Sequence, residues 1–393
     1  MRIVIAHLGN NWVKMPGGVE KITCEFANAM VERGHDVTIL YRDKREGDPY
    51  FPLSPKVKVH NILFKNGQQI IAEKIPVPLR IWRECCRLFS QNEAQAVNAK
   101  YKGKQYGGVI RQYLKTHLPD VIVSCSVPSS KFVLDDAQIH VPVIQMIHAD
   151  PAVQFPQLSK VERQAAAKCS VIQILLPAGL PAAKKYFPHV PIVVIGNVVQ
   201  PAEKLASPGN KKKRYTISCV GNICSRKNQK LLADAFALIE KDFPEWQVEF
   251  WGSGEGEKLE SHIKEKKIQR VYCKGQTSNV ASVYANSDIF CLPSRSEGFG
   301  LAVGEAMAAG LPCVGVKTCF GVKDLIADGE TGFLVESTAE SLAEGLRRLM
   351  TNPELRQKMG KNGMKRIQQY APIHIWDQWE KLMIQVVQGG DHT

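Results

Sequence analysis

The fold is decided by one stretch, Ser294-Arg295-Ser296-Glu297-Gly298-Phe299-Gly300-Leu301-Ala302-Val303-Gly304-Glu305. It directly follows a short apolar run, residues 288–292, which is predicted to be a buried strand, and it opens a predicted helix at residues 301–309. A strand, a glycine-rich turn and a helix N-terminus together make an anion site, because unpaired backbone N–H groups and the positive end of the helix dipole meet at the turn.

Two carboxylates bracket this turn. Glu297 precedes the predicted helix and Glu305 lies inside it, eight residues further on, so both are expected to point into the same crevice. The alternative is structural: the glycines only permit a tight turn, and the glutamates cap the helix.

The rest of the chain repeats this strand–turn–helix pattern. Short apolar runs alternate with longer amphipathic segments, which indicates parallel sheets covered by helices. The predicted strands are residues 2–8, 36–41, 120–125, 141–148, 170–175 and 191–196 in the first half, and 215–220, 247–251, 270–273, 288–292 and 312–316 in the second. The predicted helices are residues 19–33, 229–241, 258–267, 301–309 and 341–350.

A polar, proline-containing linker at residues 200–213 separates the two halves. We therefore predict an α/β protein with two facing Rossmann-like domains, residues 1–198 and 199–372, each with a parallel sheet. An apolar helical pattern at residues 373–393 is expected to return to the first domain. Ligands of such sheets bind at the carboxyl ends of the strands.

The stretch from Ser294 to Val314 resembles the E-x7-E region of retaining glycosyltransferases of the GT-B fold, most closely glycosyltransferase family 4, and the similarity extends over nearly the whole chain. The resemblance implies that Glu297 lies against the donor sugar as a catalytic residue and that Glu305 binds the ribose hydroxyls of a nucleotide. Carboxylates suit both tasks, because their oxygens accept paired hydrogen bonds. The resemblance also places the turn residues at the donor: Gly298, Phe299, Gly300 and Leu301.

A second strand–turn–helix unit, residues 220–229, resembles the family pattern G-R-x-x-x-x-K, whose Arg and Lys bind the donor diphosphate. Lys227 stands at the Lys position, and Asn222 replaces the Arg. We expect the neighbouring Arg226 to supply the missing charge, because its planar guanidinium suits phosphate. The alternative is that Arg226 and Lys227 are solvated residues at a helix start, where cations are electrostatically disfavoured.

Three further features fall in family order. Gly17 and Gly18 form a turn after the first strand, and the resemblance places this turn near the donor phosphates. His148 ends the predicted strand 141–148, where the family has a histidine that contacts the donor sugar, so it is the second predicted catalytic residue. The glycine loop at residues 252–256 either touches the nucleotide region or only turns the chain.

Charge and cysteine content limit the classes of partner and the compartment that we expect. Residues 1–198 hold 25 Lys and Arg against 15 Asp and Glu, a surplus of ten, whereas residues 199–393 hold 26 against 23, a surplus of three. Such an excess favours an anionic partner, but the sequence contains no nucleic-acid-binding motif and no metal-ligand pattern, so we expect neither nucleic acid nor a metal cofactor. The eleven cysteines form no C-x-x-C pair, which is typical of reduced thiols in a cytosolic protein. No apolar run reaches membrane-spanning length.

Most of the basic surplus lies in residues 74–115, which contain nine Lys and Arg against two acids. Within this segment, residues 79–89 mix apolar and cationic side chains in a short predicted helix that could lie on an anionic membrane. The candidate surface consists of Arg80, Trp82, Arg83 and Arg87. In the alternative, Trp82 and Phe89 enter the core.

The function predicted from these features is retaining transfer of a hexose-type sugar from a nucleotide-diphosphate sugar, with UDP favoured, to a glycan or lipid-linked glycan acceptor. The expected setting is lipopolysaccharide or other cell-envelope polysaccharide synthesis, in the cytoplasm or peripherally at the cytoplasmic face of a membrane. Two alternatives stay open: a GT-B sugar-nucleotide epimerase, and a non-catalytic glycan-binding relative. A nicotinamide-dependent enzyme is disfavoured because no G-x-G-x-x-G follows the first strand.

Overall fold

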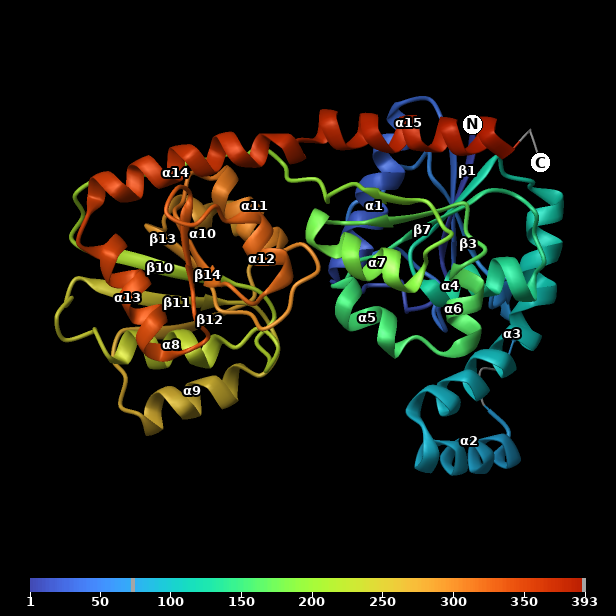
Figure 1. Cartoon of the computed structure of the whole chain (residues 1–393), viewed down its shortest axis with the longest axis horizontal. Helices are drawn as coiled ribbons and strands as arrows, with labels where there is room; N and C mark the ends of the chain where they lie inside the picture. The colour runs from blue at the N-terminus through green and yellow to red at the C-terminus, as the bar shows by residue number, and fades with distance from the viewer. Residues whose placement is uncertain (72–74, 391–393) are drawn as a thin grey trace. The chain divides into compact units, whose positions relative to one another are not determined.

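The computed structural model describes residues 1–71 and 75–390, and the chain divides into two compact units. Unit 1 comprises Met1–Gly196 with Trp376–Thr393, and unit 2 comprises Asn197–Ile375. Figure 1 shows both units as α/β folds in which helices cover a central sheet. Lys74, in the predicted basic segment, and residues 391–393, in the predicted last helix, lie outside the described residues.

The sheet of unit 1 is parallel throughout and has the order β3-β2-β1-β6-β7-β8-β9. Its strands are β1 (Arg2–His7), β2 (Asp36–Tyr41), β3 (Lys58–Asn61), β6 (Val121–Ser124), β7 (Val143–Met146), β8 (Val171–Ile174) and β9 (Ile192–Val194). The chain winds outward first on one side of β1 and then on the other, so the order reverses between β1 and β6. This reversal is the switch point at which doubly wound sheets bind ligands.

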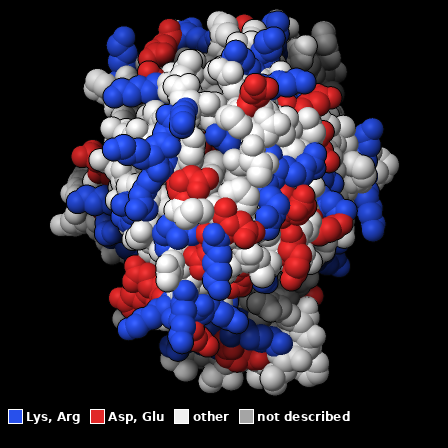
Figure 2. All heavy atoms as spheres, turned by 90° about the vertical axis from the view of Figure 1, so that its left-hand side faces the viewer, with Lys and Arg blue, Asp and Glu red and all other residues white. Residues whose placement is uncertain are grey.

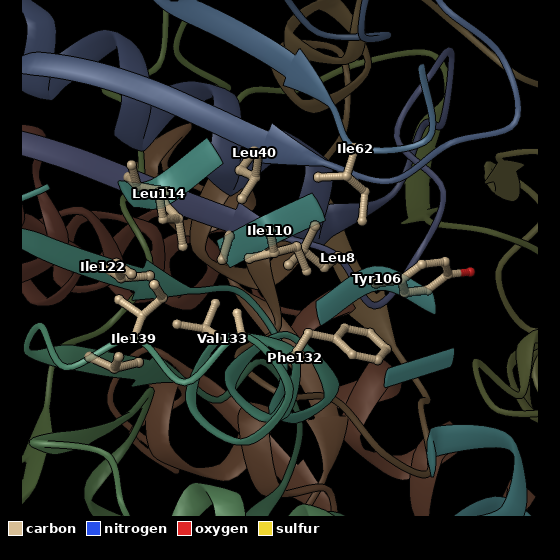
Figure 3. Packing of buried hydrophobic residues seen from close by; sticks show 14 of the residues in the cluster. Leu8, Leu40, Ile62, Tyr106, Ile110, Leu114, Ile122, Phe132, Val133 and Ile139 are labelled. Atoms are coloured by element: carbon tan, nitrogen blue, oxygen red, sulfur yellow. The ribbon is translucent and has the colours of Figure 1, made fainter. Parts of the chain in front are cut away.

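Helices and a small hairpin complete unit 1. The helices are α1 (Gly18–Glu32), α2 (Val77–Phe89), α3 (Gln91–Thr116), α4 (Val127–Lys131), α5 (Pro151–Gln157), α6 (Lys160–Ala166), α7 (Leu180–Tyr186) and α15 (Pro372–Gly390), and the hairpin pairs β4 (Phe64–Lys65) with β5 (Gln68–Gln69). Figure 3 shows how Tyr106, Ile110 and Leu114 of α3 pack with Leu8, Leu40 and Ile122 from the sheet and its loops. All six of these side chains are fully buried.

The sheet of unit 2 has the same winding, in the order β12-β11-β10-β13-β14-β15, and is also parallel. Its strands are β10 (Tyr215–Val220), β11 (Trp246–Trp251), β12 (Val271–Gly275), β13 (Ile289–Leu292), β14 (Cys313–Val316) and β15 (Gly332–Val335). Its helices are α8 (Gln229–Ala237), α9 (Gly256–Glu265), α10 (Val280–Ala285), α11 (Leu301–Ala308), α12 (Phe320–Leu325), α13 (Ala339–Met350) and α14 (Pro353–Ile367). The switch point of this sheet lies between β10 and β13.

These two sheets confirm the predicted α/β class with two Rossmann-like domains. Each predicted strand is present and ends within two residues of its expected bounds, while β3 and β15 were not predicted. The predicted helix 229–241 is wrong at its end, because α8 stops at Ala237 and residues 238–242 form turns.

The C-terminal helix α15 packs on α1 of unit 1. The rings of Trp376 and Trp379 meet Phe26 edge-on at 5.9 and 5.2 Å. Arg33, just after α1, donates to Asp377 at 2.6 Å and to Glu380 at 2.7 Å. Aromatic burial and a two-pronged arginine contact together join the end of the chain to its first helix.

The view in Figure 2 shows Lys and Arg interspersed with Asp and Glu, so this face presents no continuous patch of one sign. Within the described residues, no helix combines the length and the apolar character needed to cross a bilayer.

Candidate active site

A constellation of charged groups lies in unit 2, at its switch point. One loop follows β10 and contains Arg226 and Lys227, and a second follows β13 and contains Glu297. Because β10 and β13 are neighbouring parallel strands, their carboxyl ends deliver the two loops to the same edge of the sheet.

Side chains and backbone join these two loops. Lys227 Nζ lies 2.7 Å from Glu297 Oε1, and Arg226 Nη1 lies 3.3 Å from Glu297 Oε2. Arg226 also donates through Nη1 to the Ser296 carbonyl at 2.6 Å, and the Arg295 N–H donates to the Arg226 carbonyl at 2.9 Å. The structure therefore brings together the two predicted cations and the predicted catalytic carboxylate.

Exposure differs among these three groups. The side chains of Lys227 and Glu297 are 13% and 9% exposed, whereas that of Arg226 is 52% exposed. An inner ion pair is thus bordered by a cation that reaches solvent. An arriving anion meets Arg226 first, and it finds Lys227 in a partly desolvated setting where a charge interaction is stronger than in water.

The glycine loop at residues 252–256 supports the Lys227 loop. The Ile223 N–H donates to the Ser253 carbonyl at 2.6 Å, and the Glu255 N–H donates to the Ile223 carbonyl at 2.8 Å. Gly252 has φ of +151°, and a Cβ there would lie 2.1 Å from the Gly221 carbonyl oxygen, so only glycine fits. The loop both turns the chain and fixes the cation loop in place.

Asn222, which stands at the family's Arg position, is part of this support. Its Oδ1 accepts from Ser253 Oγ at 3.4 Å, and its carbonyl accepts from Gln229 Nε2 at 3.0 Å. Arg226 contacts the same carboxylate as Lys227, so its position is compatible with the expected replacement of the missing charge.

The turn into α11 is held by its surroundings. Gly300 is the N-cap of α11 in the left-handed region, with φ of +85°. The Glu297 carbonyl accepts from the Gly321 N–H at 3.1 Å, which ties the turn to α12. Phe299 is buried, and its ring meets Tyr370 edge-on at 5.0 Å. A donor contact by Phe299 would therefore come from its backbone, as for the neighbouring Gly298.

The second bracketing carboxylate, Glu305, lies on α11 and accepts a hydrogen bond from the Tyr284 hydroxyl at 3.0 Å. Burial raises the pKa of Tyr284 well above its usual value, and the Glu305 charge adds to this, so the phenol stays a donor. Tyr284 thereby orients one carboxylate oxygen of Glu305. Sequence reasoning missed Tyr284, because α10 carries no motif around it.

In unit 1 a buried polar cluster lies at the carboxyl end of β1. His7 Nε2 lies 3.5 Å from Glu20 Oε1, and the two side chains are 2% and 8% exposed. Gly17 is the N-cap of α1 and Gly18 its first residue, so the predicted glycine turn places Glu20 in the first turn of the helix. A Cβ on Gly17 would clash with the Glu20 carboxylate.

His148, two residues beyond β7, belongs electrostatically to the same cluster. Burial, together with the nearby charge of His7, lowers the pKa of His148 to about 4, so its imidazole is neutral at pH 7. Burial alone would also lower the pKa of His7, but contacts with Cys125 and Glu20 outweigh it and raise the pKa to about 9. The cluster therefore holds one cationic and one neutral imidazole. His7 and Glu20 were not predicted as site residues.

Nearby Asp150 has a structural role: its side chain accepts from the Ala152 N–H at 2.9 Å and caps α5. In the described part of the chain, no group of three or more His, Cys, Asp or Glu side chains is arranged to hold a metal ion.

Two doubly wound parallel sheets in one chain are the architecture of the GT-B class of α/β proteins. Residues 201–366, which lie within unit 2 and contain both of its site loops, match the family model described as Glycosyl transferases group 1. Together, the fold and this match support a GT-B glycosyltransferase.

Comparisons over the whole chain agree with this class. An uncharacterized glycosyltransferase of Haemophilus influenzae is 27% identical over 378 residues, which are 93% of this chain and 96% of that protein. The Campylobacter jejuni protein GalNAc-alpha-(1->4)-GalNAc-alpha-(1->3)-diNAcBac-PP-undecaprenol alpha-1,4-N-acetyl-D-galactosaminyltransferase is 22% identical over 376 residues, 94% of this chain and 96% of that protein. A mutant of S. aureus TarM, solved with Fondaparinux, alpha-GlcNAc-glycerol and UDP, has the same fold, with a TM-score of 0.74 at 16% identity over 97% of this chain and 99% of that one.

Proposed function

We propose that this protein is a retaining glycosyltransferase that moves a hexose-type sugar from a nucleotide-diphosphate sugar to a glycan acceptor. The observation that carries the proposal is the convergence of Arg226, Lys227 and Glu297 at the switch point of unit 2. Cleavage of a sugar nucleotide develops negative charge on the departing diphosphate, and two fixed cations stabilise that charge as it forms.

The charged residues of the unit 2 site each receive a role in this proposal. Lys227 and Arg226 bind the diphosphate, and because both charges come from the chain itself, we propose that the transfer needs no metal cofactor. Glu297 keeps lone pairs free beyond its two cationic contacts, and these accept hydrogen bonds from hydroxyls of the donor sugar. Glu305, oriented by Tyr284, is assigned to the ribose hydroxyls.

In the same proposal, His148 contacts the sugar that is transferred. A neutral imidazole donates or accepts a hydrogen bond without placing a second positive charge near the anomeric carbon, where positive charge develops during transfer. Retention of configuration is part of the proposal and follows from the resemblance around Glu297 and Glu305.

The relatives support particular choices of donor and acceptor. TarM was solved with UDP, and the Campylobacter relative is named for transfer to an undecaprenol-linked glycan. We therefore favour a UDP-sugar donor and a lipid-linked or lipopolysaccharide-type acceptor, in cell-envelope glycan synthesis on the cytoplasmic side. The eleven cysteines, all described, are all free, which fits a reducing compartment.

The test is a panel of UDP-, GDP- and ADP-sugars, with and without glycan acceptors, in which nucleotide release is measured and the anomeric configuration of the product is determined by NMR. Glu297→Gln is expected to abolish transfer while nucleotide binding, measured by calorimetry, stays within about twofold, because the amide keeps the shape but loses the charge. Transfer by the variant near the original rate would show that the role of Glu297 is wrong.

The same panel separates the alternatives. An epimerase would change the sugar nucleotide without consuming an acceptor, and a non-catalytic relative would bind nucleotide without releasing it from any donor.

A further inference from the structure

Helix α2 of unit 1 exposes an unusual amount of apolar surface. We define the α2 apolar face as Val77, Ile81, Trp82, Cys85, Leu88 and Phe89. All six residues are exposed, with Trp82 60%, Leu88 85% and Phe89 90% accessible. At 3.6 residues per turn they fall on one side of the helix. None of the α2 residues is buried, so the predicted alternative in which Trp82 and Phe89 enter the core is wrong.

The side of α2 opposite to the apolar face holds the helix in place on unit 1. Leu79, Arg83 and Cys86 are only partly exposed, and they share the side of α2 opposite to the apolar face. α2 packs on α3, and Arg83 Nη1 donates to Asn98 of α3 at 3.5 Å. In Figure 1, α2 lies at the far end of α3, away from the sheet of unit 1. The α2 apolar face is thus presented outward by a helix that is anchored on its opposite side.

A basic edge borders the α2 apolar face. Arg83 and Arg87 contact Glu84 at 2.6 and 2.8 Å, and Arg80 completes three arginines around one glutamate. The three arginines and the one glutamate leave an excess of two positive charges on this short helix. Lys100 and Lys104 on the adjoining α3 are exposed and extend the positive charge.

We propose that α2 is a docking helix that lies in the interface of an anionic lipid membrane, with the α2 apolar face toward the acyl chains and Arg80 and Arg87 at the head groups. Trp and Phe favour this interface, and arginine is attracted to anionic lipids. A water-facing helix gains nothing from exposing Trp82, Leu88 and Phe89 together, and the basic edge identifies the sign of the surface that covers them.

This inference goes beyond the proposed transfer reaction and does not depend on it. The test uses full-length protein, no sugar nucleotide, and vesicles of phosphatidylcholine alone or mixed with phosphatidylglycerol. We expect co-sedimentation with the anionic vesicles at low salt, and a loss of binding as salt rises or as phosphatidylglycerol is omitted. Absence of co-sedimentation with anionic vesicles at low salt overturns the proposal.

Variants assign the binding to α2. Trp82→Ser with Phe89→Ser is expected to lower the partition coefficient by about tenfold or more, because both large apolar groups are lost from the interface. The matched control is Leu205→Ser with Leu238→Ser, which removes two exposed apolar side chains, 60% and 55% accessible, from unit 2. Equal binding by the α2 variant and the wild type overturns the proposal.

A second pair tests the basic edge. Arg80→Gln with Arg87→Gln is expected to weaken binding to anionic vesicles by about tenfold and to flatten the salt dependence. Lys358→Gln with Lys361→Gln, two exposed lysines on α14, removes the same charge elsewhere and should leave binding within about twofold.

Fluorescence locates the contact directly. The other five tryptophans are buried or partly buried, so a blue shift of emission upon vesicle addition is expected to come from Trp82. The conservative variant Trp82→Phe should keep binding but lose the shift. The wild type could instead prove to be a dimer that the double variant Trp82→Ser, Phe89→Ser converts to a monomer. If vesicles do not compete with that dimerisation, a second copy of the chain covers the α2 apolar face, and the membrane proposal is overturned.

Discussion

The two units place polar groups at the carboxyl ends of equivalent strands, but they do so in different ways. In unit 2, Lys227 and Glu297 lie on loops that are joined by a backbone hydrogen bond, and the neighbouring Arg226 reaches solvent. In unit 1, His7 and Glu20 are 2% and 8% exposed and pair inside the fold. The same winding order thus supports an accessible charged site in one unit and a buried electrostatic cluster in the other.

This difference separates the groups that can contact a ligand directly from those that only shift the pKa of a neighbouring group. The ion pair of unit 2 can exchange one partner for an incoming anion, because an exposed cation borders it. The His7–Glu20 pair is enclosed, and it acts on a ligand only through a third group such as His148, whose pKa the nearby His7 charge helps to lower. Substitution of Lys227 or Glu297 should therefore change the chemistry, and breaking the His7–Glu20 pair should change stability and its pH dependence.

The largest expected effect comes from Lys227→Ala. Loss of the inner cation should lower donor turnover by about 10²- to 10³-fold, because a positioned group that stabilises transition-state charge contributes about 3–4 kcal/mol. Nucleotide release from the best donor of the panel measures this. Lys230→Ala, an exposed lysine at the start of α8, is the matched control and should stay within about twofold of the wild type. An equal loss of turnover in both variants would mean that Lys227 has no specific role in the reaction.

Next in size is Gly252→Ala, which tests whether the accessible site depends on its supporting loop. The added Cβ would meet the Gly221 carbonyl oxygen at a backbone φ that side chains avoid, so the free energy of unfolding should fall by about 3 kcal/mol or more. Denaturant unfolding measures the change. Gly256→Ala, in the same loop, meets only Ile223 at 3.8 Å and should be nearly neutral.

How far the sequence predicts each unit follows from the same comparison. The site of unit 2 was predictable, because strand, glycine turn and helix stand next to one another in the chain around Lys227 and Glu297. The cluster of unit 1 joins His7, Glu20 and His148 from three separate segments. No spacing within the sequence predicts that the buried imidazole and the carboxylate lie close together. Only His148 was predicted, and it came from the family resemblance.

Two other features could not be predicted from the sequence: the short edge strands, and which side of a helix is buried. β3 has only four residues, two of them exposed, so it gives no clear apolar run, whereas β15 is an apolar run of only four residues, too short to stand out in the sequence. The amphipathic pattern of α2 was predicted, but whether Trp82 and Phe89 faced the core or solvent depended on where α3 carries the helix. Burial of that kind is a property of tertiary structure and not of the pattern.

A smaller effect is expected for Glu20→Gln, which breaks the buried pair of unit 1. The folded-state pKa of His7 is raised to about 9 from an ordinary 6.5, so its stabilising contribution is complete below pH 6.5 and is lost as pH rises through 9. The pKa of Glu20 is lowered, so its contribution is present above its usual value of 4.5 and is lost as pH falls. The variant should therefore be less stable than the wild type by about 2 kcal/mol near pH 6.5, and the gap should shrink toward pH 9.

Denaturant unfolding at pH 6.5, 7.5 and 9 checks this prediction, with Glu32→Gln, an exposed carboxylate on the same helix, as the control. A gap that stays constant over this range would mean that His7 does not keep its proton through Glu20.

The smallest effect is expected for Tyr284→Phe, which alters the accessible site of unit 2 from its buried side. The variant removes the hydroxyl that donates to Glu305 at 3.0 Å and leaves the ring packed against Phe290. One hydrogen bond to a charged acceptor contributes about 1.5 kcal/mol, part of which water at the partly exposed Glu305 replaces, so nucleotide affinity should fall by about three- to fivefold. Calorimetric titration with the released nucleotide measures the change, and Tyr272→Phe, which is 43% exposed, is the control. A change in affinity without a change in maximal turnover would assign Tyr284 and Glu305 to nucleotide binding, whereas the reverse pattern would place Glu305 in the chemical step.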